Sequence, residues 1–268
     1  MSVIHLDMRD LGMAALLVLS LAALSFVMRL QLERRIMLSA IRTTVQLLLI
    51  GLVLKSLFAG SNLFWISLMA FVMLAVAGRE VMQRQKRPFS GWWGYGLGTL
   101  SMFVSSFATA IFALLVVIGT DPWYLPQYSI PLLGMMLGNT MNGVALALDR
   151  LTSSAWQQRA VIETRLSLGQ EWSEAIRDIS RDSLRTGMLP IINAMAAAGI
   201  VSLPGMMTGQ ILSGTPPLEA VKYQILIMFM IASGTGFATV IATWLGARRL
   251  FDGRQRLSLY RLSNSGVK

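Results

Sequence analysis

Long stretches without a charged residue constrain this chain more than any other feature. Crossing about 30 Å of hydrocarbon as a helix takes about 20 predominantly apolar residues. Six charge-free runs reach or approach that length, and a seventh apolar stretch is interrupted by Arg42 alone. The six runs are 11–28, 56–78, 88–120, 122–148, 186–218 and 223–247. The sequence therefore predicts an all-α, polytopic membrane protein of about seven transmembrane helices.

Composition agrees with this class, because 13% of the residues are charged, against roughly 25% in a soluble domain. Barrel strands would be short and alternating in polarity, whereas these runs are continuous. We predict one transmembrane domain over 1–268, with the segment 149–185 outside the membrane. The expected helices are approximately 11–28, 36–54, 58–78, 96–118, 128–148, 187–213 and 223–247.

The basic residues predict the orientation. Lys and Arg accumulate on the cytoplasmic side of membrane proteins, and nearly all 23 of them fall in alternate connections and in the C-terminal tail. The N-terminus is therefore expected outside and the C-terminus in the cytoplasm. This topology, with attraction to anionic membrane lipid, accounts for the net charge of +10 without a nucleic-acid partner.

The sequence does not offer the residues that several kinds of chemistry require. Cysteine is absent and the single histidine, His5, precedes the first span. All acidic residues fall outside the expected spans, whereas ion-driven carriers usually need a carboxylate or histidine inside the membrane. No glycine precedes a lysine, so the phosphate-binding loop of ATPases is missing. We expect a protein that is not an enzyme and that takes energy for uphill transport from another chain.

The segment 149–185 contains an amphipathic pattern. Trp172, Ala175, Ile176 and Ile179 recur on one helical face, and Ser167 to Gly169 separates them from a preceding helical piece. Two short helices joined at this glycine predict a protruding cytoplasmic knob. A helix lying on the lipid surface is the equally supported alternative.

Two spans carry residues suited to a transport path. Leu203-Pro204-Gly205 lies within 187–213 and predicts a kink or break, which serves gating in some transporters and plain packing in other proteins. In 128–148, the pair Gly134 and Gly138 predicts close helix approach. Asn139 and Asn142 follow, as interhelical contacts or as the wall of a polar path.

Methionines are concentrated in the same two spans. Met135, Met136, Met141, Met195, Met206 and Met207 are among the 18 in the chain. Thioethers bind soft metals, but methionine is also an adaptable packing residue, and no ligand set is assigned.

A polar stripe follows the span 36–54. It consists of Ser39, Arg42, Thr43 and Gln46. Arg42 is expected to extend to the cytoplasmic surface or, alternatively, to contact the segment 149–185.

Five segments resemble the FetB-like permeases, the membrane subunits of a bacterial ATP-binding-cassette (ABC) system linked to iron export. They occur in the order and spacing of that family, and the most specific is VSLPGMMTG. The segments are PLLGMMLGNTMN (131–142), LSLG (166–169), RDSLR (181–185), VSLPGMMTG (201–209) and KYQI (222–225).

The resemblance implies a multi-pass permease of the bacterial inner membrane that pairs with itself and with two ATPase chains. ATP would act through the partner, and no cofactor would be bound covalently. The exported substrate would be iron, although related plant proteins are tied to aluminium tolerance. A stand-alone seven-helix channel or receptor, and an ABC permease for a non-iron substrate, remain the alternatives.

The residues that would carry this function form two sets. A weaker likeness to the coupling loop of ABC importers involves Glu163, Gly169 and Ile179, but Leu189 and Pro190 come later than in that pattern. The expected ATPase-coupling residues are Glu163, Leu168, Gly169, Trp172 and Ile176. The expected substrate-path residues are Met135, Asn139, Asn142, Pro204, Gly205, Met206 and Met207.

Overall fold

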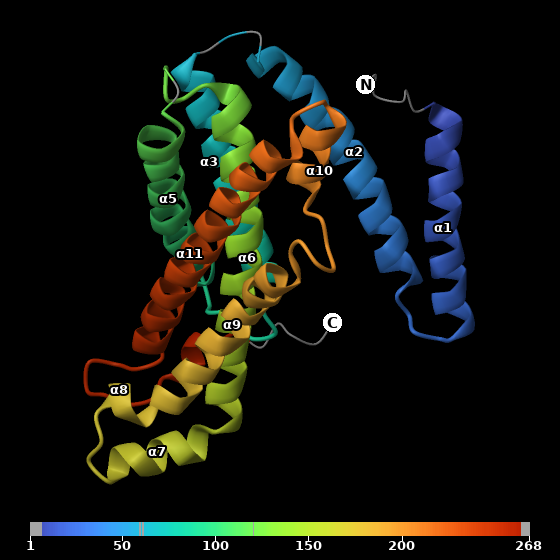
Figure 1. Ribbon diagram of the computed structural model, residues 1–268. Coiled ribbons are helices and arrows are strands. Elements are labelled where there is room, and N and C mark those ends of the chain that lie inside the picture. Colours follow the sequence, from blue (N-terminus) through green and yellow to red (C-terminus); the bar gives the residue numbers. More distant parts are fainter. Residues whose placement is uncertain (1–6, 59, 61, 120, 264–268) are drawn as a thin grey trace.

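The fold is all-helical in a computed structural model that describes residues 7–58, 60, 62–119 and 121–263 (Figure 1). His5 lies outside these residues. The helices of the N-terminal half are α1 (Met8–Val27), α2 (Glu33–Phe58), α3 (Leu63–Gln83), α4 (Trp92–Met102), the π-helix η1 (Phe103–Phe107), α5 (Ala108–Phe112) and the π-helix η2 (Ala113–Ile118). Those of the C-terminal half are α6 (Pro126–Gln157), α7 (Arg159–Ser167), α8 (Trp172–Ala175), α9 (Arg177–Ala197), α10 (Gly205–Leu212), α11 (Pro217–Arg249) and the 3₁₀-helix η3 (Leu259–Arg261).

Six helical stretches of the described chain are long and apolar enough to cross a membrane. The predicted class of an all-α polytopic membrane protein is confirmed. The count differs from seven at 187–213, which is not one helix: α9 ends at Ala197 and α10 begins at Gly205. Gly199 adopts φ +82° and Pro204 precedes α10, and both conformations interrupt a helix. In Figure 1, α9 and α10 together lead from one end of the molecule to the other.

Helices α6, α9 and α11 form the centre of the molecule and cross closely at two glycines. A Cβ on Gly187 would lie 2.6 Å from the backbone oxygen of Gly143, and a Cβ on Gly143 would lie 2.7 Å from Cγ2 of Thr235. The predicted close-approach pair is wrong: Gly138 has open space where a Cβ would be, and Gly134 meets one methionine methyl group. Glycine spacing alone does not reveal which helix face is covered.

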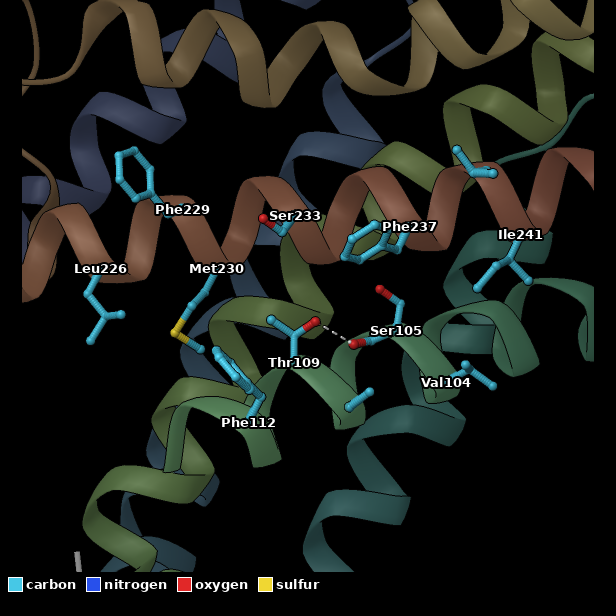
Figure 2. A pocket seen from close by; sticks show the side chains of 12 residues that line it. Val104, Ser105, Thr109, Phe112, Leu226, Phe229, Met230, Ser233, Phe237 and Ile241 are labelled. Carbon is cyan, nitrogen blue, oxygen red and sulfur yellow. Dashed lines mark hydrogen bonds between the residues drawn. The ribbon is translucent and has the colours of Figure 1, made fainter. Parts of the chain in front are cut away.

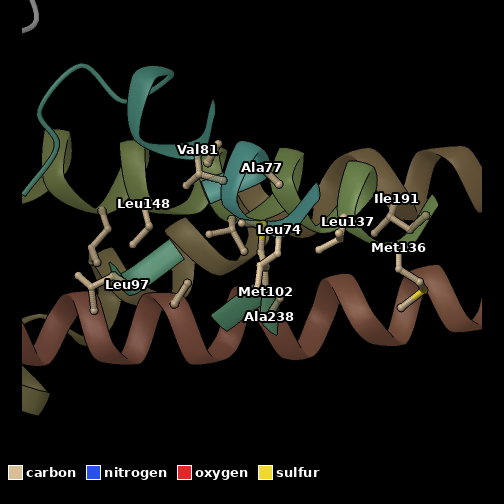
Figure 3. Close-up of a cluster of buried hydrophobic side chains, with 14 of the residues drawn as sticks. Leu74, Ala77, Val81, Leu97, Met102, Met136, Leu137, Leu148, Ile191 and Ala238 are labelled. Carbon is tan, nitrogen blue, oxygen red and sulfur yellow. The ribbon is translucent and has the colours of Figure 1, made fainter. Parts of the chain in front are cut away.

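A continuous apolar core joins α6 and α11 to α3, α4 and α9 (Figure 3). Its largest fully buried side chains include Met102, Met136, Leu148 and Leu151. Met136 contacts the α11 backbone so closely that a Cβ on Gly234 would lie 2.3 Å from its methyl carbon. This methionine serves packing.

The stretch from Trp92 to Ile118 alternates α- and π-helical turns. It starts before the predicted 96, so that Trp92 and Trp93 belong to the helix. The Ser105 hydroxyl donates to the Gly234 carbonyl oxygen at 2.6 Å, and the hydroxyl oxygens of Ser106 and Thr140 are 3.1 Å apart. These bonds tie η1 to α11 and α6.

The α1–α2 hairpin stands apart from this centre in Figure 1. No residue of α2 is buried. Nη2 of Arg42 lies 3.2 Å from Oε1 of Glu80 on α3, so Arg42 pairs with α3 and not with the segment 149–185. Helix α3 continues to Gln83 and includes Glu80, five residues beyond the predicted end at 78.

Candidate functional site

Helices α7 and α8 form a projection at one end of the molecule (Figure 1). On the orientation predicted from the basic residues, this end is cytoplasmic. The part that projects is shorter than the predicted segment 149–185, because α6 extends to Gln157 and α9 begins at Arg177. The projection is therefore continuous with two long helices of the centre.

The turn at the tip of the projection depends on Gly169. Its φ is +88°, a left-handed conformation that strains other residues. The N–H of Gly169 donates to the Leu166 carbonyl at 3.0 Å, and that of Gln170 donates to the Arg165 carbonyl at 3.1 Å. This pair of bonds is the Schellman motif that ends helices. It presents Leu168 with 78% of its surface exposed.

A small apolar interior supports the tip from below. Ile162, Ala175 and Ile176 are each 1% exposed. Ile176 thus lies inside the projection and offers no surface to a partner, whereas Glu163 is exposed on α7. Apolar burial within so short a segment fixes the orientation of α7 against α8 and α9.

One ion pair joins the projection to α9, and a second joins α9 to α6. Nη2 of Arg165 lies 2.8 Å from Oδ2 of Asp178, and its Nη1 donates to the Ala175 carbonyl at 3.3 Å. Nη2 of Arg150 on α6 lies 2.6 Å from Oδ2 of Asp182 on α9. The projection is thereby held to α9, and the base of α9 is held to α6.

Trp172 faces the C-terminal segment 250–263. Its backbone N–H donates to Oε1 of Gln255 at 3.0 Å. The centroid of the Trp172 ring lies 5.8 Å from that of Phe251 and 5.1 Å from the Arg248 guanidinium. Trp172 is therefore a contact between the projection and the C-terminal segment, which sequence reasoning had not connected with the site.

A tight turn organises the C-terminal segment around Asp252. Oδ1 of Asp252 accepts from the N–H groups of Arg254 and Arg256 at 2.9 and 2.8 Å. The Arg256 N–H, followed by the Arg254 N–H and the Arg256 guanidinium, lowers the pKa of Asp252 below its ordinary value. The Asp-Gly pair at 252–253 was the available sequence signal for this turn.

The other end of the C-terminal segment joins the α3–α4 connection. The N–H of Ser90 donates to the Arg261 carbonyl at 2.8 Å, and the N–H of Ser263 donates to the Pro88 carbonyl at 2.8 Å. Phe89 and Leu262 are both buried here. The segment thus connects Trp172 with the start of α4.

The predicted path residues of α6 have unlike surroundings. Asn139 donates to the Met135 carbonyl of its own helix at 2.8 Å, and Met135 packs partly against the core. Asn142 is exposed, and its Oδ1 accepts a hydrogen bond from Nη1 of Arg84 on α3. Asn142 is thus the member of this group that contacts another element through its side chain.

The predicted path residues near the break belong to α10 and its cap. Pro204 is the N-cap and Gly205 the first residue of α10, which packs on α11. Met206 packs partly against the core, and Met207 is half-buried. The structure places this group at the end opposite the projection (Figure 1), and the Asn139–Asn142 group midway along α6. The two groups are therefore separate along the helix axes.

An apolar cavity of about 640 Å³ separates α11 from η1 and α5 (Figure 2). Phe112, Phe229 and Phe237 line it, and none of the predicted path residues does. The Thr109 hydroxyl at its wall donates to the Ser105 carbonyl at 2.8 Å. Among the described residues, no group of three or more His, Asp or Glu side chains is placed to hold a metal ion.

Residues 8–251 match the family described as uncharacterised protein family UPF0014. The chain belongs to the UPF0014 family. A UPF0014 membrane protein of Synechocystis is 38% identical over 263 residues, which cover 96% of this chain and 98% of the relative. No solved structure matches this UPF0014 protein.

Two further relatives of this UPF0014 chain have descriptive names. The Escherichia coli protein named "Probable iron export permease protein FetB" is 32% identical over 259 residues, covering 94% of this chain and 95% of the relative. The Arabidopsis thaliana protein named "ALUMINUM SENSITIVE 3" is 34% identical over 234 residues, covering 87% and 83% of the two chains.

Proposed function

We propose that this protein is the membrane permease subunit of an ABC exporter whose ATPase is a separate chain. The observation that carries the proposal is the projection of α7 and α8. An exposed leucine at its tip is supported by a buried apolar interior and by an ion pair to α9, which is itself paired with α6. A rigid protrusion with an apolar tip suits docking into a cleft on a soluble subunit.

The absence of a phosphate-binding loop from the sequence fits this division of labour. Uphill transport then requires work from a second chain. Two ATPase copies and two permease copies would form the transporter, with the second permease completing the path. The ATPase binds ATP, and this chain transmits the resulting movement.

The proposed transmission runs through α9. This helix starts at the projection and ends at the Ala198–Pro204 break. A displacement of the tip would move α9 as a rod, because its base is fixed by Arg165 and Arg150. The break then acts as the hinge that changes the position of α10.

Iron is the proposed substrate, and its support is the printed name of the Escherichia coli relative. The path would pass Asn139 and then Met206 and Met207, because Oδ1 of Asn142 already accepts from Arg84. Without a carboxylate or histidine cluster among the described residues, the amide oxygen and the thioethers would make only brief contacts with the ion. Weak, successive contacts are what passage requires.

Copurification and ATP hydrolysis test this proposal. The chain is expressed with a nucleotide-binding subunit encoded beside it, the complex is isolated in lipid, and hydrolysis is measured with and without ferrous iron. We expect a stable complex with iron-stimulated hydrolysis. If iron leaves hydrolysis unchanged, the assignment of iron as the substrate is contradicted, but the assignment as an ABC permease is not. If no such subunit binds, the result favours a stand-alone channel or receptor.

Leu168→Asp probes the docking surface in the same assay. The side chain is 78% exposed, so the fold should tolerate the change while the apolar tip is lost. Tyr260→Asp is the matched control, because Tyr260 is 79% exposed on the C-terminal segment. We expect Leu168→Asp to abolish copurification and Tyr260→Asp to preserve it. An equal yield of complex with both variants would contradict docking at the tip.

A further inference from the structure

A groove of about 520 Å³ lies between α2, α3 and α6. One wall is the polar stripe of α2, and the opposite wall is formed by α3 and α6. The lining includes Ser39, Arg42, Thr43, Gln46, Met69, Met73, Glu80, Arg84, Gly138 and Met141. Because α2 buries none of its residues, the groove is open on the side where α2 stands away from the centre.

The charges in the groove do not balance. The charged side chains that line it, among the described residues, are Arg42, Glu80 and Arg84. Glu80 lies between the two arginines, with Oε1 3.2 Å from Nη2 of Arg42 and Oε2 3.9 Å from Nε of Arg84. One carboxylate thus serves two guanidinium groups, which leaves one positive charge.

Both guanidinium groups remain accessible. The Arg42 and Arg84 side chains are 55% and 45% exposed, against 26% for Glu80. Arg84 also donates to Asn142 Oδ1, which satisfies one of its N–H groups without adding charge. An uncompensated positive charge beside hydrocarbon is unfavourable, and guanidinium groups bind phosphate oxygens well because their N–H groups form a planar fork. The two guanidinium groups therefore suit an anionic ligand.

The wall of the groove on α3 and α6, beyond the charged residues, is long and lined mainly by apolar residues. Met69 and Arg84 are separated along α3 by a rise of about 22 Å at 1.5 Å per residue, which exceeds half of a hydrocarbon core of about 30 Å. Gly138 leaves open space in the wall, since no atom lies within 4 Å of its Cβ position. Charge at one end and a slot of leaflet length above it match the shape of a phospholipid.

We propose that this groove binds a phosphate group at Arg42 and Arg84. Its chemistry suits the headgroup of an anionic phospholipid whose acyl chain lies along Met69, Met73 and Met141. A soluble phosphate would use the same two arginines without the apolar slot. The site belongs to this chain alone and does not depend on the proposed ATPase partner or on iron.

Native mass spectrometry of the full chain released from lipid nanodiscs tests the lipid source. The nanodiscs contain phosphatidylglycerol in phosphatidylcholine, and the measured quantity is the phosphatidylglycerol retained by the protein. We expect Arg42→Gln and Arg84→Gln each to lower retention about tenfold, as loss of a charged hydrogen bond implies. Arg79→Gln is the control, because Arg79 is on the same helix but lines a different groove with Trp92 and Tyr95.

Glu80→Gln distinguishes the effect of the groove's charge on lipid binding from the effect of the ion pair on the position of α2. It breaks the same ion pair as Arg42→Gln but raises the positive charge of the groove. We expect Glu80→Gln to increase phosphatidylglycerol retention while Arg42→Gln decreases it. A decrease with both variants would show that the ion pair merely holds α2 in place, and it would overturn the proposal.

Inorganic phosphate tests the soluble source in nanodiscs of phosphatidylcholine alone. A rise in thermal stability that disappears in Arg42→Gln and persists in Arg79→Gln would support the site with a soluble ligand. Retention of phosphatidylglycerol with the same variant dependence would support it with a lipid. The proposal is overturned if neither ligand binds, or if binding is equal in the wild type and all variants.

Discussion

The backbone N–H of Trp172 donates a 3.0 Å hydrogen bond to the side-chain Oε1 of Gln255, 83 residues further along the chain. This bond places the C-terminal segment against the proposed docking projection. Because the same segment pairs with the α3–α4 connection through Ser90 and Ser263, a movement of the projection has a second route into the membrane domain besides α9.

Shortening Gln255 tests that route. Gln255 has φ +59°, a conformation that asparagine tolerates, so Gln255→Asn keeps the backbone and withdraws the acceptor from Trp172. We expect a loss of about 1 kcal/mol in the free energy of unfolding and weaker substrate stimulation of ATP hydrolysis in the complex. Gln157→Asn, at an exposed position of α6, should change neither quantity. Equal stimulation in both variants would exclude the C-terminal route.

The contact between α6 and α9 should be sensitive to a single methyl group. In Gly187→Ala, the new Cβ would meet the Gly143 backbone oxygen at 2.6 Å, and relieving such a clash costs about 1–3 kcal/mol. Gly138→Ala meets open space and should stabilise its helix by about 0.5–1 kcal/mol. Thermal unfolding in detergent checks both signs. A stable Gly187→Ala protein would mean that these helices are further apart.

The turn at the tip should accept asparagine better than valine. Gly169 has φ +88°, where a Cβ costs roughly 1–2 kcal/mol. Gly169→Val is therefore expected to loosen the projection, seen as faster amide exchange in α7, whereas Gly169→Asn should resemble the wild type. Equal exchange rates in the two variants would show that the left-handed turn is not maintained in solution.

Acid should loosen the C-terminal turn only at low pH. The pKa of Asp252 is lowered, first by the N–H of Arg256, so its carboxylate stabilises the turn at every pH above its ordinary pKa of about 3.9. That stabilisation is lost as the pH falls through the lower, folded pKa. We expect Trp172 fluorescence to change in that range in the wild type, with Asp252→Asn already altered at neutral pH. A change centred between pH 5 and 7 would implicate another group.

The membrane class was predictable because length and continuous apolarity are local properties of the chain. A projection was one of two equally supported interpretations of the glycine at 169 and the spacing of Trp172 to Ile179, beside a helix on the lipid surface. The helix 187–213 failed as a single element because Gly199 and Pro204 act through backbone conformation, which apolarity does not record. The start of α9 at Arg177 was missed because its charged first turns concealed that it continues into the membrane domain.

Contacts between segments that are far apart in the chain could not be predicted from the sequence. Nothing local to Arg42 indicates that Glu80 faces it, and the role of Gly143 with Gly187 depends on the crossing of two helices. Gln255 is one residue in a charged tail, and its contact with Trp172 depends on the turn at Asp252. The predicted path residues were chosen by chemistry along the sequence, which does not specify that one group lies midway along α6 and the other at the opposite end from the projection.

Site-specific cross-linking can locate the ATPase contact on the permease, since the chain has no native cysteine. Leu168→Cys is placed at the tip, and Ile200→Cys, 90% exposed within the break between α9 and α10, is the control. With a short bifunctional reagent and the neighbouring ATPase subunit, we expect a cross-linked permease–ATPase product from Leu168→Cys and none from Ile200→Cys. A product from Ile200→Cys alone, or from neither variant in an intact complex, would contradict docking at the α7–α8 projection.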